Sequence, residues 1–192
     1  MTKAMLDANV MVYAAAELAD PVQYSDMHRM QLASKRLLSS NADLSISAVA
    51  WAEVLRNVTP DRRKALEPYS SKMVVVPFDA QAAECAAALL DKYRRLEDVC
   101  DWCLGVKHGG PCKKCERSLS RQQKVNDAFI IAVADCQGDG AVLYSFDKGV
   151  HDMGRHARCK VLEPPEPEHQ AELFENVTAP LLPMGEIDPA AT

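Results

Sequence analysis

The sequence lacks any long apolar stretch. No run in its 192 residues approaches the roughly 18 consecutive apolar residues of a membrane-spanning helix, so no membrane partner is expected. Lys3, Asp7 and Glu17 interrupt the first twenty residues, which therefore show neither the apolar core nor the cleavage site of a signal peptide. Internal repeats are also absent. We therefore expect a cytoplasmic protein.

What the chain has instead is enough apolar material for a core. Hydrophobic residues make up 48% of it. A chain of this length and composition favours one domain with embellishments over two independent domains.

Lysine and arginine are missing from the C-terminal segment 163–188, which carries seven acidic residues. The whole chain has a net charge of -5, but without these seven acids 22 basic and 20 acidic residues remain. The acidic total therefore does not exclude a nucleic-acid partner. This proline-rich segment, taken as a tail over 164–192, is expected to be extended and solvated. Folding across a basic surface and docking on a partner are the alternatives.

Short apolar segments alternate with segments of helical period. The expected strands are 3–6, 42–46, 73–78, 141–145 and 159–163, and the third is rich in β-branched residues typical of a buried strand. The expected helices are 9–18, 27–38, one capped by Ser47 that carries Glu53, 79–95 and 119–135. Strands separated by helices predict a three-layer α/β/α fold with a mainly parallel central sheet covered on both faces.

Four acidic residues stand out in this pattern. Asp7 and Asp147 follow expected strands, whereas Glu53 and Asp127 lie on expected helices. In open parallel sheets the site lies beyond the carboxyl ends of the strands, where these side chains could converge. Four carboxylates brought together repel one another unless cations neutralise them, and oxygen ligands suit Mg²⁺ or Mn²⁺. Taken singly, Asp7 and Asp147 are equally well read as turn or cap residues, and Glu53 as an exposed helix residue.

At these positions the chain resembles the PIN-domain ribonucleases, and most closely the small VapC-like toxins of bacterial toxin–antitoxin pairs. The resemblance runs from about residue 5 to 162. The matching fragments are Asp7-Ala8-Asn9 after a strand, Ser47 to Glu53, Asn126-Asp127-Ala128 opening an apolar helix, and Ser145-Phe146-Asp147-Lys148 after another strand. The segment 95–119 and the tail after residue 162 depart from the small-toxin pattern.

The resemblance implies that Asp7, Glu53, Asp127 and Asp147 are catalytic acids that bind Mg²⁺ or Mn²⁺, with Asn9 and Ser145 as supporting polar groups. One or two such ions would orient and activate a water that hydrolyses RNA. A toxin of a type II pair would have a cognate antitoxin, and a homodimer is a further partner to test. The alternatives are an RNA-processing PIN nuclease outside such a pair and a non-catalytic RNA- or protein-binding module.

The cysteines supply a second motif. Cys100 and Cys103 form one CxxC pair and Cys112 and Cys115 another, separated by eight residues, which is the ligand spacing of a structural zinc site. Redox-active thiols and an iron–sulfur centre remain open as alternatives. We expect a zinc knuckle over 96–118, inserted in a nuclease domain that covers 1–163. Cys85, Cys136 and Cys159 lack paired spacing and are expected to be small buried apolar residues.

Basic residues gather beside the second cysteine pair and before Asp127. Such a stretch could follow RNA phosphates next to the carboxylates, or it could be a solvated helix face. The candidate RNA-binding residues are Lys113, Lys114, Arg117, Arg121 and Lys124.

Overall fold

The computed structural model describes residues 3–40, 43–94 and 121–166, and within them the fold is built on a parallel sheet. Five strands follow the order β3-β2-β1-β4-β5, and every neighbouring pair is parallel. Their bounds are β1 Ala4–Leu6, β2 Leu44–Ser47, β3 Val74–Val76, β4 Val142–Tyr144 and β5 Lys160–Leu162. The predicted α/β fold with a central parallel sheet is confirmed.

The register of the sheet aligns the ends of its three central strands. Leu6, the last residue of β1, pairs with Ile46 of β2 on one side and Tyr144 of β4 on the other. Asp7, Ser47 and Ser145 come directly after these three residues, so they lie side by side at one edge of the sheet. All three are buried, so the carboxyl ends of these strands form a polar edge of the sheet.

The third strand differs from its prediction. We expected 73–78 to be a buried strand, but β3 lies at the edge of the sheet. Val74 is 63% exposed and Val75 is 46% exposed. The β-branched residues favour the strand conformation, whereas the strand order decides how deeply it is buried.

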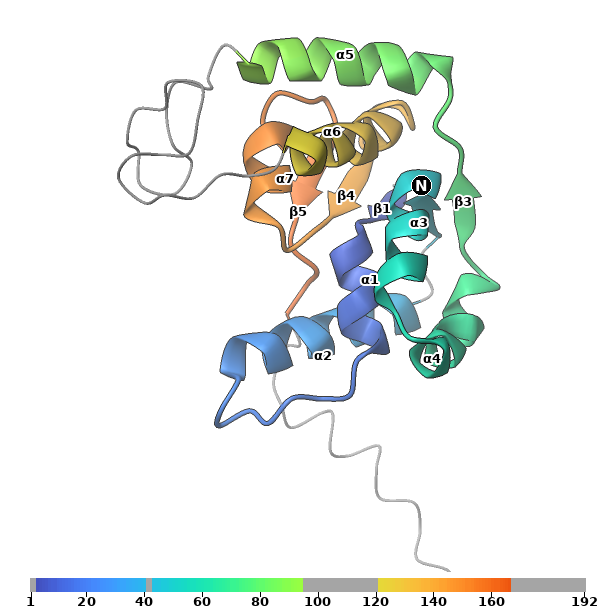
Figure 1. The fold of residues 1–192 in the computed structure, drawn as a ribbon, viewed down its shortest axis with the longest axis vertical. Helices are drawn as coiled ribbons and strands as arrows, with labels where there is room; N and C mark the ends of the chain where they lie inside the picture. The colour runs from blue at the N-terminus through green and yellow to red at the C-terminus, as the bar shows by residue number, and fades with distance from the viewer. Residues whose placement is uncertain (1–2, 41–42, 95–120, 167–192) are drawn as a thin grey trace, which may run out of the picture.

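Seven helices connect the described strands. Their bounds are α1 Ala8–Ala15, α2 Ser25–Ser39, α3 Ala48–Asn57, α4 Pro60–Ser70, α5 Ala80–Arg94, α6 Arg121–Asp135 and α7 Lys148–Gly154. α1 contacts α2, α3 and α4, whereas α6 contacts α5 and α7. Figure 1 shows α5, α6 and α7 gathered in the upper half of the view and α1, α2 and α4 in the lower half.

The strand order explains these two groups. From β1 the chain steps to β2 and β3 in one direction, then crosses to β4 and β5 on the other side of β1. Right-handed crossovers that run in opposite directions put their helices on opposite faces of the sheet. The connections through α1 to α4 therefore form one layer, and those through α5 to α7 form the other.

No helix in the described ranges is both long and apolar enough to cross a membrane.

Two helices were not predicted from the sequence. α4 begins after Thr59 with Pro60 at its first position, which is a recognisable start signal, but only Leu66 of this helix is buried. α7 spans seven residues, and Asp147 caps its N-terminus by accepting a hydrogen bond from the Gly149 N–H (2.6 Å). Helices this short or this exposed leave little hydrophobic period to detect.

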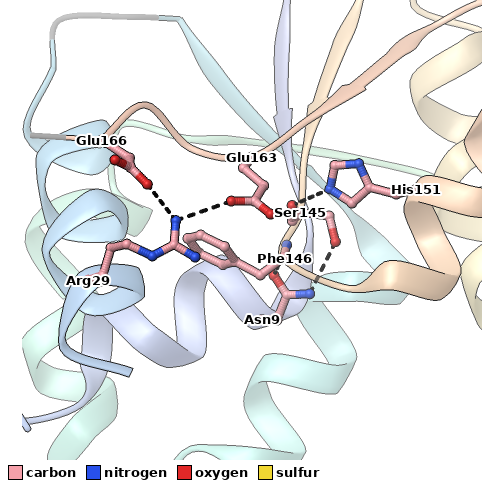
Figure 2. Close-up of polar contacts among 7 residues, drawn as sticks. All are labelled: Asn9, Arg29, Ser145, Phe146, His151, Glu163 and Glu166. Carbon is pink, nitrogen blue, oxygen red and sulfur yellow. Dashed lines mark hydrogen bonds and ion pairs between the residues drawn. The ribbon is translucent and has the colours of Figure 1, made fainter. Parts of the chain in front are cut away.

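The first residues of the acidic tail contact α2. Arg29 Nη1 lies 2.7 Å from Glu166 Oε1 and 3.4 Å from Glu163 Oε2. Figure 2 draws both ion pairs. Pro164, between the two acids, is buried. The ion pairs are exposed, so each contributes at most about 1 kcal/mol. The segment 163–166 is thus held on α2; the rest of the expected tail lies outside the described residues.

Candidate active site

Asp7 is the most constrained of the four acids. It caps α1, where its Oδ1 accepts a hydrogen bond from the Ala8 N–H (2.6 Å). Its Oδ2 accepts two more, from Ser145 Oγ (2.6 Å) and from Asn9 Nδ2 (2.8 Å). Three donors therefore fix a carboxylate that is only 4% exposed.

Ser145 and Asn9 join the ends of β1 and β4 around this carboxylate. Ser145 Oγ accepts hydrogen bonds from Asn9 Nδ2 (3.1 Å) and from the Asp147 N–H (2.9 Å). Asn9 Oδ1 accepts from the Phe146 N–H (3.2 Å). The two residues predicted to support the acids thus lie next to Asp7, and they hold the backbone that leads to Asp147.

Ser145→Ala is expected to lower the free energy of unfolding by about 1–3 kcal/mol, because buried partners of its hydroxyl lose their hydrogen bonds. In a chain of this length that corresponds to a fall in Tm of about 3–9 °C. Thermal unfolding followed by circular dichroism measures it. Ser45→Ala is the matched control, since Ser45 Oγ donates only to the Ala4 carbonyl (3.1 Å) from a half-buried position. Equal Tm losses in the two variants would contradict a special role for Ser145.

Asp127 and Glu53 contrast with Asp7. Asp127 lies on α6 and Glu53 on α3, and both are half-buried. Within 3–40, 43–94 and 121–166, neither carboxylate has a hydrogen-bond or ion-pair partner. α3 and α6 contact each other, and the charge of Glu53 acts on both Asp127 and Asp7, so both helical acids lie near the polar edge of the sheet. Their oxygens are therefore available to an incoming ligand.

Asp147 lies against Asp127 across a glycine. A β-carbon built on Gly149 would lie 3.0 Å from Asp147 Oδ1 and 3.4 Å from Asp127 Oδ2. Both oxygens therefore border the same small volume, although the two residues come from different helices and are separated by twenty positions.

Burial and mutual repulsion raise the pKa values of two of the acids. The pKa of Asp127 is raised to about 8, mainly by burial and in part by the charges of Asp147, Asp7 and Glu53. The pKa of Asp7 is raised to about 6, mainly by burial; hydrogen bonds from Ser145 and Ala8 oppose the rise, and the charges of Asp147 and Glu53 add to it. Each of the four predicted acids therefore appears in the electrostatic environment of another.

This donor set fits a hydrated divalent cation. No group of three or more acidic, histidine or cysteine side chains in the described ranges is close enough to enclose a metal ion. Mg²⁺, however, usually keeps several waters and is held by only one or two carboxylates. Asp127 and Asp147 provide such a pair, and an ion there would relieve the repulsion that raises the pKa of Asp127. Direct ligation by all four acids stays a prediction.

The cysteine motif and most of the candidate RNA-binding residues lie outside the described residues. All four cysteines of the expected zinc knuckle do, and so do Lys113, Lys114 and Arg117. Arg121 is the first residue of α6, and Lys124 is half-buried on the same helix, three residues before Asp127. The structure therefore leaves both the zinc site and the RNA-binding residues as predictions.

The three remaining cysteines were expected to be buried. Cys159 is, at 5% exposure, and burial raises the pKa of its thiol to about 12. Cys85 and Cys136 are only half-buried, and the Cys136 thiol donates to the Cys85 sulfur at 3.5 Å. Burial raises the pKa of Cys136 to about 11, with a contribution from this bond. Their proximity comes from the packing of α5 on α6 and has no signature in the sequence.

Sequence reasoning also missed His151. Its Nε2 lies 2.8 Å from the Ser145 carbonyl oxygen, a contact drawn in Figure 2. His151 follows Asp147 by four residues on α7, so it lies on the same side of the helix. A helix prediction for 148–154 would have placed it beside the site.

Comparison with known proteins decides the family. The profile of the PIN domain matches residues 4–156, which includes all four acids. The chain belongs to the PIN domain family. No curated protein matches this PIN domain.

Solved structures show the same fold. A chain from the VapBC2 complex of Rickettsia felis, bound to a DNA fragment from its promoter, has a TM-score of 0.52 and 16% identity. The match covers 84% of the present chain and 98% of that chain. A chain from DNA-bound VapBC of Salmonella typhimurium has a TM-score of 0.50 and 15% identity, covering 86% and 100%. At this identity the likeness shows the fold alone.

Proposed function

We propose that this PIN domain is a metal-dependent endoribonuclease that hydrolyses RNA phosphodiester bonds with Mg²⁺ or Mn²⁺. The observation that carries the proposal is the electrostatic coupling of four acids at the carboxyl edge of the sheet, with Asp127 unpaired in the described structure and its pKa raised to about 8. Membership of the PIN family supports the same chemistry.

The contacts of each acid indicate a different role in the proposed site. Asp127 and Asp147 would hold the cation, because their oxygens border one volume and lie at a sheet edge open to a ligand. Asp7 is fixed by three hydrogen bonds, so it offers a carboxylate of defined position from the floor of the site. A bound Mg²⁺ or Mn²⁺ would supply an activated water and stabilise charge on the leaving oxygen.

The protonation state of Asp127 determines the pH range in which the site can bind a cation. With a pKa of about 8, it carries a proton in much of the metal-free protein at neutral pH. Binding of a cation requires the carboxylate form, so this proton leaves as the cation enters. Glu53 lies on α3, and its negative charge would add to that of the other acids in attracting the cation.

We also propose that the protein is the toxin of a type II toxin–antitoxin pair. The two structural neighbours are chains of VapBC complexes bound to DNA. A cognate antitoxin would cover the acidic site, and a homodimer is a further expected assembly. Cleavage by an RNA-processing nuclease would have the same chemistry, so co-expression with the product of the adjacent gene separates the two roles.

Cleavage of a mixed pool of structured and single-stranded RNA tests the nuclease proposal. The purified parent protein is expected to cut RNA with Mn²⁺ or Mg²⁺ and to stop when excess chelator is added. Activity that persists in chelator would contradict metal dependence. An inert, metal-loaded and inhibitor-free protein would favour the non-catalytic binding module.

We further propose a structural zinc ion held by Cys100, Cys103, Cys112 and Cys115. The support is the spacing of two CxxC pairs, and four thiolates at about 2.3 Å would fold an insert with little apolar material of its own. The basic residues within this insert and just after it are proposed to contact RNA phosphates: Lys113, Lys114, Arg117, Arg121 and Lys124.

The purified protein is expected to contain about one zinc ion per chain. Elemental analysis by mass spectrometry measures it, and Cys112→Ser should lose most of the metal. Cys85→Ser is the matched control, because Cys85 lies outside the motif and should leave the zinc content unchanged. Iron in place of zinc would assign a cluster, and absence of both metals would leave the cysteines as redox-active or free thiols.

A further inference from the structure

Gly149 occupies an unusual place between two of the candidate metal ligands. Its N–H donates to Asp147 Oδ1 at 2.6 Å, which fixes that carboxylate. A β-carbon at this position would lie 3.0 Å from Asp147 Oδ1 and 3.4 Å from Asp127 Oδ2. The absent side chain therefore leaves a volume lined by oxygens from two helices.

The backbone does not explain the glycine. Gly138 and Gly140 have φ angles of 101° and 84°, where glycine is strongly favoured, but Gly149 does not lie in this left-handed region. It lies inside α7, where alanine would be the better helix former. Backbone conformation and helix propensity therefore give no reason for glycine at 149.

Packing against apolar side chains does not explain the glycine at 149 either, although it does explain Gly154, the other glycine of α7. A β-carbon at Gly154 would lie 2.3 Å from Val161 Cγ2, so β5 excludes any side chain there. At Gly149 the atoms that a side chain would crowd are two carboxylate oxygens. The space beside them is polar, negatively charged and at the edge of the sheet where the acids converge.

We propose that Gly149 is a positioning residue of the metal site, whose missing side chain keeps open the space in which a hydrated divalent cation binds between Asp127 and Asp147. This inference rests on the proposed metal dependence. Mg²⁺ demands near-octahedral coordination and keeps several waters. A methyl group beside both carboxylates would take the place of such waters and could not bind the ion.

Binding of Mn²⁺ to the full-length, metal-free protein tests the inference without reference to RNA cleavage. Isothermal titration calorimetry at about pH 8 compares the parent with Gly149→Ala. The variant is expected to bind Mn²⁺ at least about tenfold more weakly, as is typical when groups around metal ligands are changed. Its Tm without metal should stay the same or rise by up to about 3 °C, because alanine favours the helix.

Gly154→Ala is the matched control, with the opposite pattern expected. The clash with Val161 should lower the Tm, while the Mn²⁺ affinity of the folded protein should stay within about twofold of the parent. Together the two variants separate the space beside the acids from the general effect of adding a methyl group to α7.

Each outcome is decisive. Equal Mn²⁺ affinities for the parent and Gly149→Ala overturn the role of Gly149 and leave the proposed nuclease intact. A weaker affinity accompanied by a clear fall in Tm without metal assigns Gly149 to the fold and also overturns the inference. A parent that binds no Mn²⁺, or binds it as well as Asp127→Asn does, overturns both proposals.

Discussion

Asp127→Asn is expected to lower metal-dependent RNA cleavage by about 10²–10³-fold. The substitution keeps the size of the side chain but removes a charged ligand, and stabilisation of transition-state charge by a metal ion amounts to several kcal/mol, with about 1.4 kcal/mol per factor of ten. Initial rates with the RNA pool and saturating Mn²⁺ measure the loss.

The fold of this variant should survive, because the Asp127 carboxylate has no hydrogen-bond partner in the described structure to lose. Glu84→Gln, an exposed site on α5, is the control for removing one negative charge and should retain full activity. If Asp127→Asn cleaves RNA as fast as the parent, either the activity is a contaminant or the site is elsewhere.

The metal-free protein is expected to become less stable as the pH rises from about 5.5 to 8.5. Asp7 and Asp127 have ordinary pKa values of 3.8 when unfolded and values of about 6 and about 8 when folded. The folded state therefore binds more protons than the unfolded state across this window. The resulting stability is fully present below pH 3.8 and is lost as the pH passes the two folded values.

The size of the effect follows from the shifts. One unit of pKa corresponds to about 1.4 kcal/mol, and the two acids share part of their repulsion, so the loss is on the order of a few kcal/mol. That corresponds to a fall in Tm of about 5–10 °C for a chain of this length. Thermal unfolding in chelator over this pH range measures it.

Two matched measurements assign the pH dependence to the acids. Asp127→Asn should flatten the part of the curve between about pH 7 and pH 8.5, because the titrating group is gone. Saturating Mn²⁺ should flatten it in the parent, and Mn²⁺ affinity should rise by up to about tenfold per pH unit below the pKa of Asp127. A Tm that falls with pH equally in both proteins would contradict the raised pKa of Asp127.

Parts of the fold could be predicted because they depend on local chemistry. The segment that forms β1 is short and apolar and is followed by an acid. Ser47 caps α3, because its Oγ accepts a hydrogen bond from the Ala50 N–H (3.0 Å). Asp79 likewise accepts from the Ala82 N–H (2.9 Å) at the start of α5. Such signals involve residues within a few positions of each other, so they survive in any tertiary arrangement.

Other parts depend on contacts that no local pattern records. α7 has too few residues for a period, and its start at Asp147 is recognisable only once the preceding strand is placed. The exposure of Val74 follows from the position of β3 at the edge of the sheet. The Cys85–Cys136 contact follows from helix packing between residues that are 51 positions apart.

For the candidate site, the sequence by itself determined the chemistry: which acids follow strands, which lie on helices, and that oxygen ligands at the carboxyl edge would suit a hard cation. The tertiary structure alone decided their environments. The aligned ends of β1 and β4 bury Asp7 among three donors, whereas Asp127 on α6 has no donor among the described residues, so that burial and repulsion raise its pKa unopposed. The position of Gly149 beside the acids became visible only once α7 was placed against α6. Space between side chains is a property of packing, and no single residue in the sequence records it.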